Sequence, residues 1–450
     1  MKKVLIITTH FAPDIHVGAK RITKFTKHLP EYGWHPSILT KEINEYHGLD
    51  ESLLQELPSD LPVYRIPAWR FPKRKLPLSM VSHGVFLAQD KKKNITLRIR
   101  LLSILKFNFL FYDYAWLLPA FLKARYLLRK EGIQVIYSSA PNHEAHLVAL
   151  MLKLTMPVKW VCEFRDPWTT LHQYYHISVI QRKSDRYFEK LILQYSDHII
   201  SVGQMLKSEL MKLSGNLCND KISVIYNGYD KADFVDSFPL AVARENKCVI
   251  TYTGTWGPGR SPECFLRALS LLLQNSPDIR DDLRVNFIGE FKHTPELEDK
   301  VMQYIKQANL NDVVSFVPWL PYRESLARLL SSDILLLVER PESSTNNNFW
   351  VVTSKIFLYL YARKPILALI PPGGEAARII SENNAGDVVS PTDIETIAAK
   401  ICEMYERYKR GELVSQVKLS EIDKYERRKQ TGELAEIFDA HIATSRAKRE

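Results

Sequence analysis

The chain has 450 residues, of which 46% are hydrophobic and 25% are charged, and its formal net charge is +10. Because a single hydrophobic core rarely supports this length, we expect two globular domains. The five cysteines are odd in number, widely spaced and never in a C-x-x-C pair. This pattern excludes a disulfide framework or a zinc site of the usual spacing, and it favours a reducing cytoplasm.

The first residues predict a β-strand rather than a signal peptide. Two lysines precede an apolar run, but the run covers only residues 4–7 and no small-residue cleavage site follows it. The longest apolar stretch, residues 107–122, is interrupted by Asp113 and Pro119 and is too short to span a membrane.

The N-terminal half alternates strand and helix patterns. Residues 3–9 are apolar and β-branched, as in a buried parallel strand. A loop with Pro13 and Gly18 follows, and then a helix over residues 19–29. Further strands are predicted at residues 35–40, 133–139, 158–164, 197–202 and 222–226, with helices at 143–154 and 181–195. This alternation predicts βαβ units and a parallel sheet.

The same alternation starts again after a polar stretch near residues 235–247. A strand at 248–253 leads through a glycine-rich loop to a helix at 261–274. Further strands are predicted at residues 284–288, 313–317, 333–338 and 365–370, and the last 50 residues are charged and helical. The expected fold is therefore α/β, with two Rossmann-like domains facing a central cleft.

The basic charge is concentrated in residues 61–130. This segment has 15 Lys and Arg against 2 Asp and Glu, whereas the rest of the chain has 46 against 49. Aromatic residues such as Trp69, Phe107 and Trp116 are interleaved with the basic ones. This composition favours contact with an anionic membrane surface. Nucleic acid would also attract it, but the chain has no nucleic-acid-binding module, and a solvated basic loop is the third interpretation.

Several motifs are absent from the sequence. No G-x-G-x-x-G follows the first strand, and no G-x-x-x-x-G-K-[ST] occurs, which disfavours a dinucleotide cofactor and a P-loop. No D-x-D occurs either. Since an acidic pair of this kind commonly holds a divalent metal, we expect neither a metal nor a cofactor.

Two loops and one helix start are candidates for binding a diphosphate. The loop at residues 11–21 contains Gly18 and then Arg21, and an Arg can pair with a phosphate through two hydrogen bonds. A plain βα turn with a surface Arg is the alternative. Gly254 opens the second loop and Arg260 ends it, although an adaptable loop would have the same composition. Lys355 begins a predicted helix, where backbone N–H groups already favour an anion.

The segment EFRDPW ends a predicted buried strand at residues 163–168. Arg165 and Asp166 would then lie at the carboxyl end of a parallel sheet, where α/β folds bind ligands. Asp166 would orient a substrate or act as a base. The alternative is an Arg–Asp pair that caps the strand, with Trp168 in the core.

His143 and His146 lie three residues apart at the start of a predicted helix, on one face of it. This spacing suits metal ligands, but Glu144 is the one acidic residue nearby and no Cys is close. We therefore expect contact with an acceptor substrate or ordinary packing.

The chain resembles GT-B glycosyltransferases of the family 4 type, in the branch that builds bacterial surface polysaccharides. The resemblance covers nearly the whole length and is carried by KVLIITTHFAPD, IYSSAPN, EFRDPW, VIYNGYD, TYTG and KIFLYLYARKPILA in this order and spacing. It implies an N-terminal domain over residues 1–235 on the acceptor side and a C-terminal domain over 240–424 for the nucleotide sugar. Residues 425–450 would pack back on the first domain.

The resemblance also implies roles for individual residues. Arg260 and Lys355 would bind the donor diphosphate with Gly254, and Gly18 would lie beside it. Residues 317–320, from Val317 to Leu320, would flank the base. Transfer would need no metal and would retain the anomeric configuration.

One position departs from the family pattern. The family commonly has two Glu eight residues apart, of which the second binds the donor ribose, and here these positions are Trp350 and Leu358. Leu cannot accept a hydrogen bond, and losing one to a ligand hydroxyl costs about 1 kcal/mol or more. Another acid must bind the ribose, with Glu339, Glu342 and Glu375 as candidates, or activity is reduced.

We therefore expect a cytoplasmic enzyme, peripherally bound to the inner face of the cell membrane. It would transfer a hexosyl group from a nucleotide-diphosphate sugar to a polysaccharide or lipid-linked oligosaccharide, and it would not bind nucleic acid. Two alternatives stay open. One is a GT-B epimerase acting on the nucleotide sugar itself, and the other is a non-catalytic GT-B partner in a biosynthetic complex, which Leu358 favours.

Overall fold

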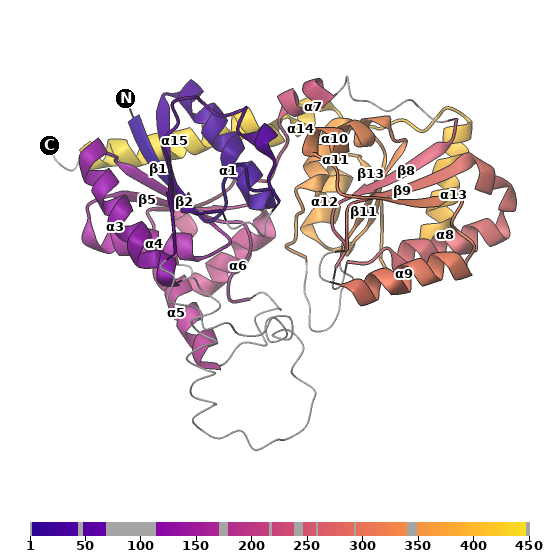
Figure 1. Ribbon diagram of the computed structural model, residues 1–450, viewed down its shortest axis with the longest axis horizontal. Helices are drawn as coiled ribbons and strands as arrows, with labels where there is room; N and C mark the ends of the chain where they lie inside the picture. The colour runs from indigo at the N-terminus through magenta and orange to yellow at the C-terminus, as the bar shows by residue number, and fades with distance from the viewer. Residues whose placement is uncertain are drawn as a thin grey trace, which may run out of the picture. The chain divides into compact units, whose positions relative to one another are not determined.

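The computed structural model describes residues 2–43, 48–68, 114–170, 179–215, 218–237, 246–257, 260–291, 294–339 and 349–446. The chain divides into two compact units (Figure 1). The first unit consists of Met1–Val202, Leu206–Ile225 and Thr431–Glu450, and the second of Gly203–Met205 and Tyr226–Gln430. Each unit has its own parallel sheet with helices on both faces, which confirms the predicted α/β class with two parallel sheets.

The sheet of the first unit has seven parallel strands in the order β3-β2-β1-β4-β5-β6-β7. Their bounds are β1 Lys2–Thr8, β2 Trp34–Lys41, β3 Val63–Ile66, β4 Val135–Ala140, β5 Lys159–Phe164, β6 His198–Ser201 and β7 Ile222–Val224. The helices are α1 Val17–His28, α3 Tyr114–Glu131, α4 Glu144–Thr155, α5 Val179–Tyr195, α6 Gln204–Ser214 and α15 Arg427–Arg446.

Strand β1 shows why this sheet forms in the interior. Successive side chains of a strand point to opposite faces, and here both sets are apolar and fully buried. Val4 and Ile6 pack in one cluster with residues of α1 and α15, whereas Leu5 and Ile7 pack in another with residues of α3 and α4. A continuous apolar run is typical of a parallel strand covered on both faces.

The sheet of the second unit has six parallel strands in the order β10-β9-β8-β11-β12-β13. Their bounds are β8 Cys248–Thr253, β9 Leu283–Ile288, β10 Val314–Val317, β11 Ile334–Val338, β12 Ile366–Leu369 and β13 Gly386–Val389. The helices are α7 Lys231–Ser237, α8 Glu263–Asn275, α9 Pro295–Gln307, α10 Tyr322–Ser331, α11 Lys355–Ala362, α12 Glu375–Glu382, α13 Ile394–Lys409 and α14 Leu419–Ile422.

Both sheets share one strand order, in which the first strand lies inside the sheet and the chain turns back beside it. The reversal falls between β1 and β4 in the first unit and between β8 and β11 in the second. Open α/β sheets bind ligands outside the carboxyl ends of the strands at this switch point. The loops after these strands are therefore the first places to look for function.

Most of the predicted elements are confirmed, and two edge strands were not predicted. β3 is half-buried along its whole length, and β13 begins with Gly386 and Asp387, so neither shows a continuous apolar run. The predicted helix start at Lys355 is confirmed, and α11 ends where Arg363 adopts a left-handed φ of 53°. No helix in the described ranges is both long and apolar enough to cross a bilayer.

Candidate functional site

In the second unit, Lys355 lies directly against the loop that follows β8. Gly254 is the first residue after that strand and has a φ of 133°, which disfavours any side chain. A Cβ atom at Gly254 would lie 2.4 Å from Lys355 Nζ. The ammonium group therefore reaches the carboxyl end of the sheet only because residue 254 has no side chain.

Lys355 packs against a stack of two aromatic rings. Its Nζ donates a hydrogen bond to Tyr252 Oη at 2.9 Å and lies 4.2 Å from the centroid of that ring. Tyr252 in turn stacks on Trp256, with ring centroids 3.8 Å apart. Both rings are buried, and burial raises the pKa of Tyr252 well above its usual value. The phenol stays neutral and forms a rigid platform for the ammonium group.

A second cation of this site pairs with an acid. Arg260 Nε donates to Glu339 Oε2 at 3.2 Å, and the Arg260 Nη2 atom contacts the same oxygen. Glu339 follows β11, the neighbour of β8 across the switch point. The side chain of Glu339 is buried, and its Oε1 has no hydrogen-bond partner among the described residues. This oxygen can still accept a hydrogen bond.

The site has an unusual charge state. Burial, together with the positive charge of Arg260, lowers the pKa of Lys355 to about 7. Near neutral pH the ammonium and amine forms of Lys355 are therefore both populated. An anion bound here would stabilise the ammonium form and raise this pKa again.

The carboxyl ends of the neighbouring strands continue this surface. Gly289 follows β9 with a φ of 142°, and a Cβ atom there would lie 2.1 Å from the Gly254 carbonyl oxygen. The Gly289 amide donates to Val317 O at 2.9 Å, at the end of β10. Leu320 is half-buried in the loop beyond. The carboxyl ends of the strands in this one sheet thus bring together five of the predicted residues, which are Lys355, Gly254, Arg260, Glu339 and Val317.

The carboxylate of Glu375, another predicted ribose-binding group, already has hydrogen-bond donors of this chain. Its carboxylate is fully buried and accepts hydrogen bonds from the Gln204 and Met205 amides at 2.6 and 2.7 Å and from Tyr226 Oη at 2.8 Å. All of these groups belong to the second unit. The expectation that Glu375 binds a ribose is therefore corrected: both of its oxygens already accept hydrogen bonds within the second unit.

In the first unit, Arg165 joins the ends of β4 and α1. Arg165 Nε donates to Ala140 O at 2.9 Å, and Nη2 donates to Pro141 O at 2.8 Å. A Cβ atom at Gly18 would lie 2.1 Å from Arg165 Nη1. Gly18 is therefore needed for the approach of a guanidinium of this chain, whether or not a ligand binds beside it.

Asp166 lies next to Arg165 at the carboxyl end of β5 and is half-buried. Burial raises the pKa of this carboxyl group, and the charge of Arg165 opposes the rise. Among the described residues, none forms a hydrogen bond with the Asp166 carboxylate. Trp168 is fully buried, as the core interpretation of this segment predicted.

Arg21 has a different place from the one predicted. The side chain is only 2% exposed, and its Nε and Nη2 atoms donate to Glu163 Oε1 at 2.9 and 2.7 Å. Nη2 also donates to Ile225 O at 2.9 Å. The expectation that Arg21 binds a diphosphate is therefore corrected: this guanidinium forms a buried ion pair inside the first unit.

His143 and His146 also belong to the interior. His146 is fully buried, its Nδ1 lies 2.8 Å from Ser138 Oγ, and burial lowers its pKa to about 3. The ring of His143 stacks on Trp168 with centroids 4.3 Å apart. These contacts favour ordinary packing of the two histidines. The expectation that their rings contact an acceptor substrate is therefore corrected.

A group that the sequence interpretation missed follows β1. His10 Nδ1 lies 2.6 Å from Asp14 Oδ2, and the amide of His16 donates to Asp14 Oδ1 at 2.9 Å. The two imidazole rings stack with centroids 3.9 Å apart. Burial raises the pKa of Asp14, but the hydrogen bonds from His10 and His16 outweigh it and keep that pKa low. The signal in the sequence was H-x₃-D-x-H directly after the first strand.

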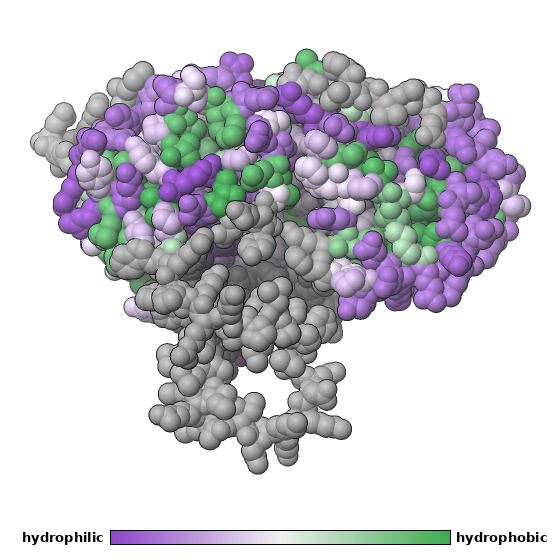
Figure 2. Space-filling view, in the orientation of Figure 1, coloured by the Kyte–Doolittle hydropathy of each residue, from purple (hydrophilic) through white to green (hydrophobic). Residues whose placement is uncertain are grey.

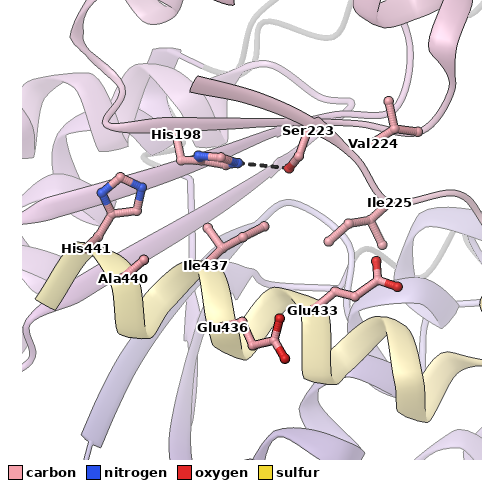
Figure 3. Close-up of a pocket in the computed structure, with 9 residues that line it drawn as sticks. All are labelled: His198, Ser223, Val224, Ile225, Glu433, Glu436, Ile437, Ala440 and His441. Carbon is pink, nitrogen blue, oxygen red and sulfur yellow. Dashed lines mark hydrogen bonds between the residues drawn. The ribbon is translucent and has the colours of Figure 1, made fainter. Parts of the chain in front are cut away.

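A pocket of about 360 Å³ opens elsewhere on the first unit, between β6, β7 and α15 (Figure 3). His198 lies 2.8 Å from Ser223 Oγ in its wall, and Glu433 and His441 line it from α15. It contains none of the predicted site residues. Within either unit taken alone, the described residues bring together no three His, Cys, Asp or Glu side chains able to hold a metal ion.

The sequence model of Glycosyltransferase Family 4 matches residues 18–233 of the chain. No curated protein sequence matches it. Among solved structures, HepE of Anabaena in complex with UDP and glucose is similar, with a TM-score of 0.63 and 14% identity over 98% of this chain and 100% of that chain.

Two further structures have similar folds. Sucrose-phosphate synthase of Thermosynechococcus elongatus has a TM-score of 0.64 and 14% identity, over 99% of this chain and 100% of that chain. WaaG, a glycosyltransferase involved in lipopolysaccharide biosynthesis, has a TM-score of 0.54 and 11% identity, over 97% and 95%. The resemblance is thereby confirmed: the chain is similar to Glycosyltransferase Family 4 over residues 18–233, and it has the GT-B fold.

Proposed function

We propose that this chain transfers a hexosyl group from a nucleotide-diphosphate sugar to a polysaccharide or lipid-linked oligosaccharide. The reaction would occur in the cytoplasm, at the inner face of the cell membrane. It would need no metal or cofactor and would retain the anomeric configuration. The family match supports transfer of a sugar, and the UDP and glucose held by HepE support a nucleotide-sugar donor.

The observation that carries the proposal is the contact of Lys355 with Gly254 and Tyr252 at the switch point of the second unit. When the bond between the anomeric carbon and the diphosphate breaks, negative charge grows on the leaving diphosphate. Lys355 would neutralise this charge, and the exposed part of Arg260 would assist it. Preorganised cations at the position of growing charge are an effective source of catalysis.

Glu339 would bind the ribose of the donor in place of the missing family acid. Leu358 is half-buried and packs against the apolar cluster of α11 and α12, so no carboxylate is available there. Glu339 lies beside Arg260 and has one oxygen without a partner among the described residues. A ribose hydroxyl would satisfy this acceptor. Glu342 lies outside the described residues.

The acceptor would bind on the first unit. Arg165 and Asp166 lie at the carboxyl ends of β4 and β5 there, and the Asp166 carboxylate would hold or orient the acceptor hydroxyl. Val317 and Leu320 would flank the base on the second unit.

Leu358 also favours a second candidate function, that of a non-catalytic partner which keeps the fold for binding.

Only the first candidate function includes turnover of a nucleotide sugar. We expect sugar transfer by the wild type, and Lys355→Ala should lower kcat at least about 100-fold, which is the usual loss when a charge-stabilising group is removed. Lys306→Ala, a matched change of an exposed lysine on α9, should leave kcat unchanged.

Three outcomes separate the candidates when a panel of nucleotide sugars is tested with and without acceptors. Transfer that depends on Lys355 supports the proposal. Conversion of the donor without any acceptor would instead indicate an epimerase. Binding without turnover of any donor would indicate the non-catalytic partner.

A further inference from the structure

The pocket between β6, β7 and α15 has no role in the proposed transfer reaction. Its volume of about 360 Å³ is within the range of small-molecule sites. β6 begins at His198, so one end of the pocket lies at the amino end of that strand. Arg165 and Asp166 follow the carboxyl end of β5, the parallel neighbour of β6. The pocket contains none of the residues proposed to bind the donor or the acceptor.

Four apolar side chains line the pocket from its two sides. Val224 and Ile225 line it from the end of β7, and Ile437 and Ala440 line it from α15 (Figure 3). Ile225 is buried in the core of the first unit, and Ile437 is half-buried. The aliphatic part of a ligand would be removed from water between these side chains, which favours binding.

Two carboxylates line the pocket from α15. Glu433 and Glu436 are three positions apart and are therefore neighbours on the surface of that helix. Among the described residues, none forms a hydrogen bond or an ion pair with either carboxylate. Partial burial and the charge of Glu436 raise the pKa of Glu433, against the opposing charge of Arg21. A cation bound between the two carboxylates would offset both their repulsion and their loss of hydration.

The other end of the pocket is polar and uncharged. His198 Nε2 lies 2.8 Å from Ser223 Oγ, and the rings of His198 and His441 have centroids 5.5 Å apart. Burial and nearby positive charges lower the pKa of His198 to about 4, and burial lowers the pKa of His441. Both rings are therefore neutral near pH 7.

One nitrogen of His198 is available to a ligand. In Figure 3, Nδ1 lies on the side of the ring that faces His441, away from Ser223. No hydrogen bond joins this nitrogen to any other residue that the structure describes. A neutral imidazole beside a hydroxyl group that can rotate can donate or accept a hydrogen bond at Nδ1. This versatility matches a ligand hydroxyl group, which can also do both.

We infer that this pocket binds a small aliphatic amino alcohol. Its ammonium group would lie between Glu433 and Glu436. Its carbon chain would lie against Ile225 and Ile437, and its hydroxyl group would form a hydrogen bond with His198 Nδ1. Because a helix rises about 1.5 Å per residue, the acidic and neutral ends are about 8–12 Å apart along α15. An amine and a hydroxyl group separated by about five carbon atoms match this span, since each adds a hydrogen bond of about 2.8 Å.

The charges around the pocket favour one ammonium group rather than two. Lys207 and Lys221 contribute to the low pKa of His198, so their positive charges act on the neutral end. Lys221 itself donates to Gln194 O at 2.8 Å and to Ser196 O at 2.7 Å. A diamine would place its second charge near these lysines, whereas a hydroxyl group adds no charge.

The test is titration of the full chain with aminopentanol, pentanediol and pentylamine, followed by ligand-observed NMR. The wild type should bind aminopentanol saturably. Pentanediol lacks the ammonium group and should bind at least about tenfold more weakly. Pentylamine lacks the hydroxyl group and should bind about three- to tenfold more weakly.

Variants assign each end of the ligand to its residues. Glu433→Gln/Glu436→Gln should weaken aminopentanol binding at least about tenfold and leave pentanediol binding unchanged. His198→Ala should reduce the affinity for aminopentanol to that for pentylamine. Glu296→Gln/Asp299→Asn is the matched control, because it removes two exposed acids three positions apart on α9. Figure 2 shows mainly hydrophilic residues where Figure 1 labels α9, and this control should bind aminopentanol like the wild type.

Three results would overturn the inference. The first is that the wild type shows no saturable binding of aminopentanol, and the second is that pentanediol binds as tightly. The third is that Glu433→Gln/Glu436→Gln binds aminopentanol like its control on α9. The inference is independent of the proposed function, because the titration measures no sugar transfer.

Discussion

Single residues of this chain have roles that follow from contacts rather than from residue type. Lys355 and Arg21 are both cations near helix starts. Lys355 lies against Gly254 at the carboxyl end of a sheet, whereas Arg21 is buried in an ion pair with Glu163. The first can meet an anionic ligand, whereas the second already has its anion. The glycine and the aromatic stack beside Lys355 distinguish a binding lysine from a structural one.

Gly254→Ala should disturb the position of Lys355. The new Cβ would lie 2.4 Å from Nζ and 2.6 Å from Cε of that lysine, so the side chain must move away from the loop. We expect the Kd for UDP to rise about tenfold, equivalent to about 1.4 kcal/mol. Isothermal calorimetry measures it.

Gly411→Ala is the control for backbone strain. Gly411 also has a positive φ, 70°, but no atom lies within 4 Å of a Cβ there. This variant should lose about 1 kcal/mol of stability and no affinity for UDP. Equal effects of the two variants on Kd would show that the contact with Lys355 is irrelevant.

Donor binding should depend on pH through Lys355. Its pKa in the free protein is lowered to about 7, and a bound diphosphate would raise it, so binding takes up a proton above pH 7. The Kd for UDP should therefore rise by up to about tenfold per pH unit between about pH 8 and 9. For Lys355→Ala the Kd should be nearly flat over this range. A wild-type Kd as flat as that of the variant would contradict the assignment.

At the scale of elements, the interior strands and the edge strands β7 and β10 could be predicted, whereas the edge strands β3 and β13 could not. β4, β8 and β11 are buried along their whole length and β1 along most of it, because helices cover both faces of their sheets. β3 and β13 are half-buried edge strands and lack such a buried stretch. The start of α11 was predictable because Lys355 precedes a regular apolar pattern.

Pairing between distant elements explains which site residues were misassigned. The partner of Arg21 is Glu163, 142 positions away, and that of Glu375 is the Gln204 amide, 171 positions away. No local pattern shows that a charged residue will be buried by such a remote partner. Gly254, Arg260 and Lys355 were predictable as a group because the carboxyl ends of neighbouring parallel strands meet at one edge.

The ion pair between α1 and β5 should stabilise the first unit rather than bind the donor. Arg21→Met leaves the fully buried carboxylate of Glu163 without its cation. We expect a loss of about 3–5 kcal/mol in the free energy of unfolding, measured by urea denaturation. Arg21→Met/Glu163→Leu should recover part of this loss. If Arg21→Met had unchanged stability but bound UDP more weakly, Arg21 would instead be a residue of the donor site.

At the scale of the whole molecule, the chain begins and ends in the same unit. Residues from Thr431 onward belong to the first unit, where the ring of Phe438 lies 5.1 Å from Trp34 and 5.9 Å from Tyr137. The C-terminal segment is therefore part of the core of the unit that the N-terminus builds.

Phe438→Ala should destabilise the first unit by about 3–5 kcal/mol, because it leaves a cavity in a closely packed core. Val414→Ala, a change at an exposed apolar residue, should alter stability by less than about 0.5 kcal/mol. Urea denaturation followed by tryptophan fluorescence reports both. Equal midpoints for the two variants would mean that α15 contributes nothing to the first unit.

The central claim is that Lys355 binds the diphosphate of a nucleotide sugar. Its most direct test is calorimetric titration of the wild type, Lys355→Ala and Lys306→Ala with UDP and other nucleoside diphosphates near pH 7. We predict that the wild type and Lys306→Ala bind one of them with the same Kd, and that Lys355→Ala binds it at least about tenfold more weakly. Equal affinity of Lys355→Ala and the wild type would contradict the account.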